Sequence, residues 1–129
     1  MRWLVDGMNL IGSRPSGWWR DRAGAMRDLV AELERYVADT GDEVTVVFDG
    51  RPSKERPAPG GAAPGRLWVA FAPGGRDAAD DQIVERVRRL RDSSGVAVVT
   101  SDKGLVERIH DSGVEVVPAG RFRDLLERK

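Results

Sequence analysis

Cysteine is absent from this sequence, and its absence removes several kinds of chemistry at once. Disulfides, thiolate metal sites and cysteine nucleophiles are all excluded, a composition that suits the cytoplasm. No apolar stretch approaches the roughly 20 residues that a membrane helix needs. No basic-then-apolar leader precedes the first apolar run. We therefore expect a cytoplasmic protein that does not contact a membrane.

Excess charge of either sign is also missing, and histidine is scarce. The 21 basic residues balance the 21 acidic ones, and His110 is the only histidine. A neutral total argues against a protein that holds nucleic acid by bulk charge. It still allows a basic rim around an acidic centre. His110 lies late in a short predicted helix, far along the chain from the acids described below, so we expect it to be exposed rather than part of a Ser-His-Asp triad.

The overall composition and length of the sequence are typical of one folded domain. Of the 129 residues, 40% are hydrophobic and 33% are charged, which is typical of a globular protein rather than a disordered one. This length fits one domain and leaves no room for a second. We treat residues 1–129 as a single domain.

Apolar runs alternate with helical patterns along this domain. Strands are predicted at 2–5, 44–48, 67–71, 96–100 and 114–117. Helices are predicted at about 21–39, about 77–92, from about 103, and around 122–126. Segments 6–17 and 51–65, rich in glycine and proline, are interpreted as loops, the second of them mobile. The alternation predicts an α/β three-layer sandwich around a parallel sheet of about five strands in the order 3-2-1-4-5.

Three of the predicted strands end at an aspartate. Asp6, Asp49 and Asp102 each follow an apolar run. Because the carboxyl ends of parallel strands lie at one edge of a sheet, these acids should meet in one crevice. Like charges gathered in a partly dry site repel each other, so such a cluster normally holds a cation. Oxygen-only ligands favour Mg²⁺ or Mn²⁺.

Two further groups are expected in this crevice. Segment 77–81 begins a predicted helix, and its two alanines would let the helix start approach the sheet edge. We expect Asp80 to point into the crevice, with Asp81 as the reserve candidate. Asn9 follows Asp6 by three residues across a glycine that permits a tight turn. Its amide would bind a carboxylate or a metal-bound water, or only its own backbone as a turn residue.

Basic and aromatic residues accompany the acids along the chain. Arginine and lysine flank each acid, which fits either a phosphate-binding rim or an ordinary charged surface. Trp18 and Trp19 would stack on unpaired bases, or would anchor their loop to the next helix. Trp68 lies in a predicted strand and is expected in the core. The candidate RNA contacts are Arg14, Trp18, Trp19, Arg20, Arg51, Lys54, Arg76 and Lys103.

The ordered motifs resemble a known family. They are VDGMN at 5–9, VVFDG at 46–50, AADDQI at 78–83 and VVTSD at 98–102. Over nearly its whole length the chain resembles NYN-domain proteins of the YacP-like group, within the PIN-like ribonuclease superfamily. The resemblance implies a metal-dependent endoribonuclease. By position, it implies that the catalytic residues are Asp6, Asn9, Asp49, Asp80 and Asp102.

This resemblance implies RNA as the partner, and the pair Trp18 and Trp19 favours single-stranded RNA, with a larger RNA-containing assembly left open. A divalent ion bound by Asp6, Asp80 and Asp102 would polarise a phosphodiester oxygen and lower the pKa of a bound water. Asp49 would bind a second ion, orient water, or support a ligand. Two alternatives are kept: an RNA-binding adaptor without activity, and a phosphatase or phosphoryl-transfer domain. The second is disfavoured because Met8 stands where one such phosphatase class needs another aspartate, and no P-loop appears.

Overall fold

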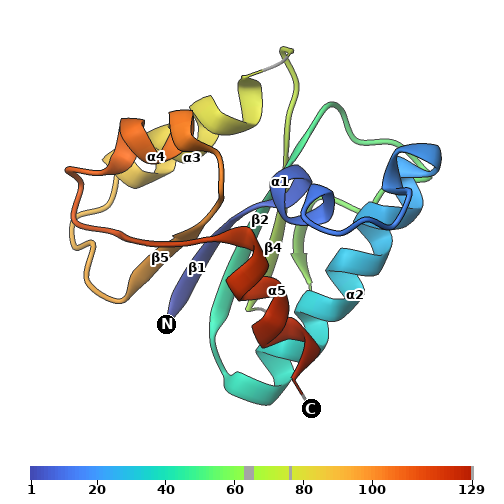
Figure 1. The fold of residues 1–129 in the computed structure, drawn as a ribbon, viewed down its shortest axis with the longest axis horizontal. Coiled ribbons are helices and arrows are strands. Elements are labelled where there is room, and N and C mark those ends of the chain that lie inside the picture. The colour runs from blue at the N-terminus through green and yellow to red at the C-terminus, as the bar shows by residue number, and fades with distance from the viewer. Residues whose placement is uncertain (63–65, 76, 129) are drawn as a thin grey trace.

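A six-stranded sheet forms the middle layer of the computed structural model, which describes residues 1–62, 66–75 and 77–128 (Figure 1). The order of its strands is β3-β4-β2-β1-β5-β6. Every neighbouring pair is parallel except β3 with β4. The strands are β1 (Arg2–Asp6), β2 (Glu43–Asp49), β3 (Gly60–Ala62), β4 (Leu67–Ala72), β5 (Val96–Val99) and β6 (Glu115–Val117). Apart from β3, the predicted strand order is confirmed.

Helices cover both faces of this sheet (Figure 1). One face carries α1 (Gly7–Gly12), α2 (Arg22–Thr40) and α5 (Ala119–Glu127). The other carries α3 (Ala78–Arg88) and α4 (Lys103–Ile109). A short 3₁₀ turn, η1 (Trp18–Arg20), joins α1 to α2. Within the described ranges, none of these helices combines the length and apolar character needed to cross a membrane.

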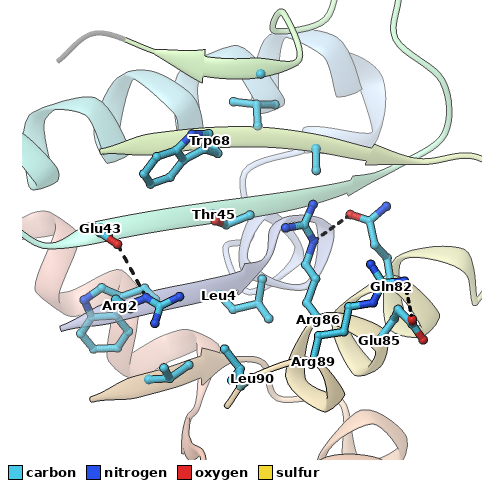
Figure 2. A pocket seen from close by; sticks show the side chains of 15 residues that line it. Arg2, Leu4, Glu43, Thr45, Trp68, Gln82, Glu85, Arg86, Arg89 and Leu90 are labelled. Carbon is cyan, nitrogen blue, oxygen red and sulfur yellow. Dashed lines mark hydrogen bonds and ion pairs between the residues drawn. The ribbon is translucent and has the colours of Figure 1, made fainter. Parts of the chain in front are cut away.

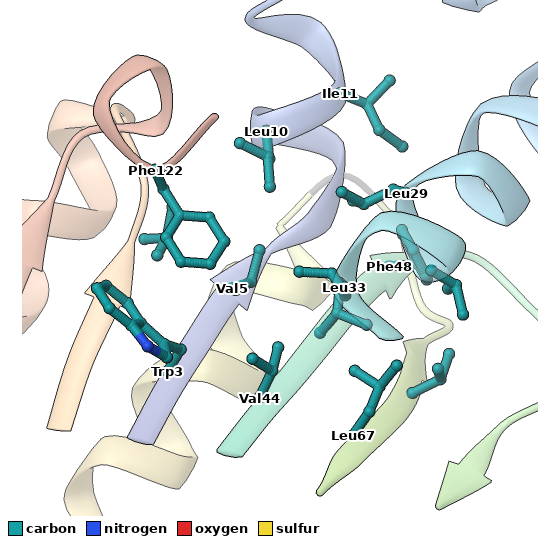
Figure 3. Packing of buried hydrophobic residues seen from close by; sticks show 14 of the residues in the cluster. Trp3, Val5, Leu10, Ile11, Leu29, Leu33, Val44, Phe48, Leu67 and Phe122 are labelled. Atoms are coloured by element: carbon teal, nitrogen blue, oxygen red, sulfur yellow. The ribbon is translucent and has the colours of Figure 1, made fainter. Parts of the chain in front are cut away.

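The larger core lies between the sheet and α2 (Figure 3). Asp21 caps this helix by accepting a hydrogen bond from the Gly24 amide at 2.9 Å. Gly41 ends it with a φ of 75°, a conformation that favours glycine. The stripe of α2 that packs on Val5 and Phe48 has helical spacing. Its buried members are Met26, Leu29, Val30, Leu33 and Val37.

One prediction that the structure corrects concerns segment 6–17, which is not all loop. Residues 7–12 form α1, because the carboxylate of Asp6 accepts the Asn9 amide at 3.5 Å and so caps the helix. Leu10 and Ile11 are buried against the core. A helix of only six residues draws its stability from such packing. It also has too few turns to show a helical pattern in the sequence, so the sequence did not predict it.

Further corrections concern the strand at the β3 edge of the sheet, the length of α3 and the position of Trp68. In segment 51–65, residues 60–62 form β3, an antiparallel edge strand beside β4, while residues 63–65 lie outside the described ranges. The sheet therefore has six strands in the described chain rather than about five. Helix α3 ends at Arg88 instead of continuing to about residue 92. Trp68 is not in the core but 39% exposed, since no helix covers its part of the sheet.

Candidate functional site

The carboxyl edge of the three central strands gathers the predicted acids. Strand β1 lies between β2 and β5 and ends at Asp6. Its neighbour β2 ends at Asp49, and the chain leaves β5 through Thr100 toward Asp102. The first turn of α3 supplies Asp80. This arrangement is the switch point of a doubly wound sheet, where ligands of such folds bind.

Asp6 is the most enclosed member of the group. Only 6% of its surface is exposed. One carboxylate oxygen accepts the Asn9 amide, and the other accepts the Thr100 hydroxyl at 3.2 Å. Burial, followed by the negative charge of Asp80, raises the pKa of Asp6 to about 6. The fold therefore holds a carboxylate whose negative charge is disfavoured by its surroundings and would be stabilised by a bound cation.

Thr100 and Asn9 fix the positions of the acids through backbone contacts. The Thr100 hydroxyl accepts the Asp102 amide at 3.1 Å while it donates to Asp6, so that one buried side chain connects two acids. The side-chain oxygen of Asn9 accepts the Ser101 amide at 2.8 Å and ties α1 to the loop after β5. Sequence reasoning missed Thr100, because a threonine at a strand end reads as an ordinary β-branched residue.

Asp80 connects the group electrostatically. Burial, followed by the charges of Asp102, Asp77 and Asp49, raises its pKa to about 6, against the lowering effect of Arg108. Asp49 also raises the pKa of Asp6. Electrostatic interactions thus link Asp80 with Asp6, Asp49 and Asp102, so the four predicted acids form one electrostatic group.

The remaining acids have distinct surroundings. Asp102 caps α4 by accepting the Gly104 amide at 2.8 Å and the Leu105 amide at 3.3 Å. Asp49 is half-buried; burial raises its pKa, and the nearby Arg22 opposes the shift. Asp81, the reserve candidate, is exposed and pairs with Arg108 at 2.9 Å. The geometry thus favours Asp80 over Asp81.

The donor set suits a small hard cation. Carboxylates are the ionisable groups of the site, and among the described residues neither Asp6 nor Asp80 forms an ion pair within 4.0 Å. In that same part of the chain, no three histidine, cysteine or acidic side chains lie together in a group that could hold a metal ion. Mg²⁺ keeps several waters and needs only one or two carboxylates, completing its shell with substrate phosphate. The residues therefore fit magnesium or manganese rather than a cation that needs a full protein shell.

The predicted basic rim is only partly available. Arg20, Arg51, Lys54 and Lys103 are exposed, and Lys103 directly follows Asp102. Arg14 instead binds Glu32 through two hydrogen bonds of 2.9 Å and Glu127 at 3.4 Å, so it links the loop after α1 to α2 and α5. Arg76 lies outside the described residues. Arg22 was not among the selected RNA contacts, although its effect on Asp49 places it near the acids.

The two adjacent tryptophans have different surroundings. Trp18 is half-buried and packs against the larger core. Trp19 is 60% exposed, and its ring meets Trp18 edge to face at 6.1 Å. The Arg20 guanidinium lies 6.0 Å from the Trp19 ring centre. Of the two uses predicted for the pair, anchoring describes Trp18, while Trp19 presents a free aromatic surface.

A central parallel sheet with helices on both faces and carboxylates at its carboxyl edge defines a PIN-like α/β domain. Residues 3–129 match the family model of the YacP-like NYN domain, and the chain belongs to that family. This family is one of PIN-like ribonucleases, and membership supports a ribonuclease-type function. The predicted family is confirmed.

Solved structures agree with this assignment. A crystal structure of a variant of Rae1 (YacP) from Bacillus subtilis is 25% identical, with a TM-score of 0.77 over 98% of this chain and 74% of that one. A second crystal structure of Rae1 (YacP) from Bacillus subtilis is 24% identical, with a TM-score of 0.73 over the same shares, and shows the likeness of fold alone. No curated protein matches the chain.

The raised pKa values predict how stability depends on pH. Asp6 has a folded-state pKa of about 6 against 3.8 in the unfolded chain, so its contribution is present below pH 3.8 and lost as pH rises through about 6. The full loss for this buried group is about 3 kcal/mol. In the presence of a chelator, urea unfolding from pH 4 to 7 should show a smaller loss for Asp80→Asn than for the natural protein. The variant lacks the raised pKa of Asp80 itself and also the repulsion that Asp80 exerts on Asp6. Parallel curves for the two proteins would contradict the coupling.

Proposed function

We propose that this protein is a metal-dependent endoribonuclease that hydrolyses RNA phosphodiester bonds at the carboxyl edge of its sheet. The observation that supports this most strongly is the electrostatic effect of Asp80 and Asp49 on Asp6, and of Asp102 and Asp49 on Asp80. The acids come from the ends of β1 and β2, the loop after β5 and the first turn of α3, and burial disfavours the ionisation of Asp6, Asp49 and Asp80. Such a cost is explained if the site binds a cation, and family membership favours RNA as the substrate.

Different residues of the site would bind the metal ion, activate the water and position the carboxylates. Asp6 and Asp80 would hold Mg²⁺ or Mn²⁺, with Asp102 beside them. When bound, the ion would lower the pKa of a water and stabilise charge on the phosphate. Asp49 would orient the attacking water or accept its proton, since its raised pKa favours proton binding. Thr100 and Asn9 keep the carboxylates in place through the hydrogen bonds described above.

The substrate that fits best is single-stranded RNA. Trp19 offers an exposed ring for an unpaired base, with Arg20 beside it. Arg22 lies close enough to affect Asp49 and would bring a phosphate toward the acids. Contacts with a larger RNA-containing assembly belong to this proposal as well.

A cleavage assay with controlled metal tests the proposal. Purified protein with end-labelled single-stranded RNA should produce internal cuts in Mg²⁺ or Mn²⁺ and none in EDTA, with activity restored by excess metal. A DNA strand of the same sequence serves as the matched substrate control and should be cut much more slowly. Binding without any cleavage in either metal would favour the adaptor alternative. Cleavage that persists in EDTA would contradict the metal-dependent mechanism.

A further inference from the structure

Figure 2 shows a groove on the face of the sheet that carries Leu4, near the start of the strands. Asp6 follows Leu4 by two residues on β1 and so points to the same face, at the other end of that strand. Its volume is about 740 Å³, within the roughly 300–1,000 Å³ of typical ligand pockets. The floor consists of Leu4, Thr45 and Trp68, which are neighbours across β1, β2 and β4. The wall is the last turns of α3, which ends too early to cover this part of the sheet. The groove is therefore separate from the acidic edge.

Trp68 is unusual in this position. It is 39% exposed on a strand that has neighbours on both sides. Its register partner on β3 is Gly61, where an added Cβ would lie 3.3 Å from the indole nitrogen. Packing against this bare backbone holds the indole in place on one side and leaves much of the ring accessible. A large aromatic surface is thus presented to the groove by a rigid strand.

Among the residues that the structure describes, the charges around the groove leave one guanidinium without a carboxylate partner. Arg2 pairs with Glu43 at 3.6 Å, and Arg89 pairs with Glu85 at 2.9 Å (Figure 2). Arg86 reaches over the sheet floor and donates only to the neutral Gln82 side chain at 3.3 Å. Among the described residues it forms no ion pair within 4.0 Å. The groove therefore combines an accessible indole with a cation available for an anion.

We propose that this groove binds an unpaired nucleotide of the RNA substrate, with the base against Trp68 and the phosphate at Arg86. The inference rests on the proposed function for the identity of the RNA. Aromatic stacking combined with arginine is the usual means of holding unpaired bases. A hydroxyl on the floor, from Thr45, adds a hydrogen-bonding group for a base edge.

The position of the groove relative to the acids suits a strand that contacts both. Leu4 and Asp6 are two residues apart on β1 and point to the same face, about 7 Å apart along the strand. Asp80 and Arg86 stand near opposite ends of α3, separated by about 9 Å of helix. RNA that passes around α3 would therefore meet the groove within a few nucleotides of the cleavage site. The groove would then set how far from an unpaired anchor the RNA is cut.

Binding measured without turnover tests this proposal separately from the nuclease activity. Fluorescence anisotropy of a labelled single-stranded RNA in EDTA compares the natural protein with Trp68→Leu and Arg86→Gln. Each change should weaken binding by roughly 5- to 100-fold, the usual effect of losing one stacked base. Arg88→Gln is the matched control, because Arg88 is an exposed residue of the same helix outside the groove, and it should change affinity less than about twofold. The Arg86 and Arg88 variants leave the core intact, so the test stands even if Trp68→Leu fails to fold.

Several results would overturn the proposal. Equal losses in Arg86→Gln and Arg88→Gln would show a general charge effect. Unchanged affinity in folded Trp68→Leu would contradict stacking of a base on Trp68.

Two other results would assign the groove to a different occupant. If uridine monophosphate bound and Trp68→Leu abolished only that binding, the groove would serve a free nucleotide. If sedimentation showed a dimer that Trp68→Leu dissociates while RNA affinity is unchanged, the groove would be a contact between two copies. Failure of the cleavage assay alone would leave the binding result standing.

Discussion

Replacing Asp6 by asparagine should reduce RNA cleavage by roughly 100-fold or more while leaving the protein folded, because the change removes a carboxylate from the proposed metal site. Asp6 stands at the centre of the sheet edge, between strands that end at the other acids. No nearby carboxylate occupies the same buried position among the described residues. The loss should appear in turnover more than in RNA binding, since the basic and aromatic contacts remain.

The same substitution should not cost stability. Asparagine keeps one side-chain oxygen that can accept the Asn9 amide or the Thr100 hydroxyl, and it caps helices about as well as aspartate. It also removes a buried charge whose pKa is raised to about 6, so at neutral pH without metal the melting temperature should rise. Added Mn²⁺ should raise the melting temperature of the natural protein more than that of the variant.

A neighbouring aspartate supplies the control. Asp81→Asn makes the same chemical change at an exposed residue paired with Arg108, and should keep cleavage within about threefold of the natural rate. Cleavage rates and melting temperatures of all three proteins, each purified free of contaminating nuclease, decide the matter. Full activity of Asp6→Asn would refute the assignment of Asp6 to the metal site. A loss of cleavage in Asp81→Asn larger than threefold would indicate that Asp81, the reserve candidate, binds the metal ion.

Replacing Gly7 by alanine should destabilise the protein strongly, by about 3 kcal/mol. A Cβ on Gly7 would lie 2.6 Å from Cδ1 of Phe48 and 2.9 Å from the carbonyl oxygen of Val47. Phe48 is fully buried and packs against Phe71 at 5.7 Å between ring centres, so its ring has little room to move. The carbonyl belongs to a central strand and is equally fixed. Relief of the clash would require α1 to move away from β2, taking Asn9 with it.

The last residue of the same helix provides a comparison. At Gly12 an added Cβ would meet only Trp18, at an ordinary 3.9 Å, and the backbone there is not left-handed. Gly12→Ala should therefore be neutral or stabilising by about 0.5 kcal/mol, because alanine restricts the unfolded chain. Urea unfolding of both variants measures the difference. A free energy of unfolding for Gly7→Ala within about 0.5 kcal/mol of the natural protein would contradict the close packing of α1 on β2.

The strand-end acids could be predicted because their signal is local. An apolar run followed by aspartate marks the carboxyl end of a strand, and the geometry of parallel sheets brings such ends together. Asp80 was chosen over Asp81 from the small residues before it, and the surroundings of the two agree with that choice. The same local reasoning predicted a helix at about 21–39, and α2 spans Arg22–Thr40.

The features that were missed depend on contacts between distant segments. The role of Thr100 becomes visible only when its hydroxyl reaches Asp6, which is 94 residues away in sequence. Arg14 was assigned to RNA because nothing in its neighbourhood along the chain reveals Glu32 or Glu127 as its partners. The exposure of Trp68 follows from where α3 ends, and helix ends are the least certain part of such reasoning.

The central place of β1 has a consequence for when the protein can act. Arg2 at its start is in register with Glu43 on one side and with Val96 on the other, so the first strand is completed by partners from the middle and the end of the chain. Closing such long loops is a late and cooperative event in folding. During synthesis, a nascent chain that has not yet released β5 from the ribosome has no complete cluster of acids. The proposed site would therefore be assembled only after β5 and the loop that carries Asp102 have joined the sheet.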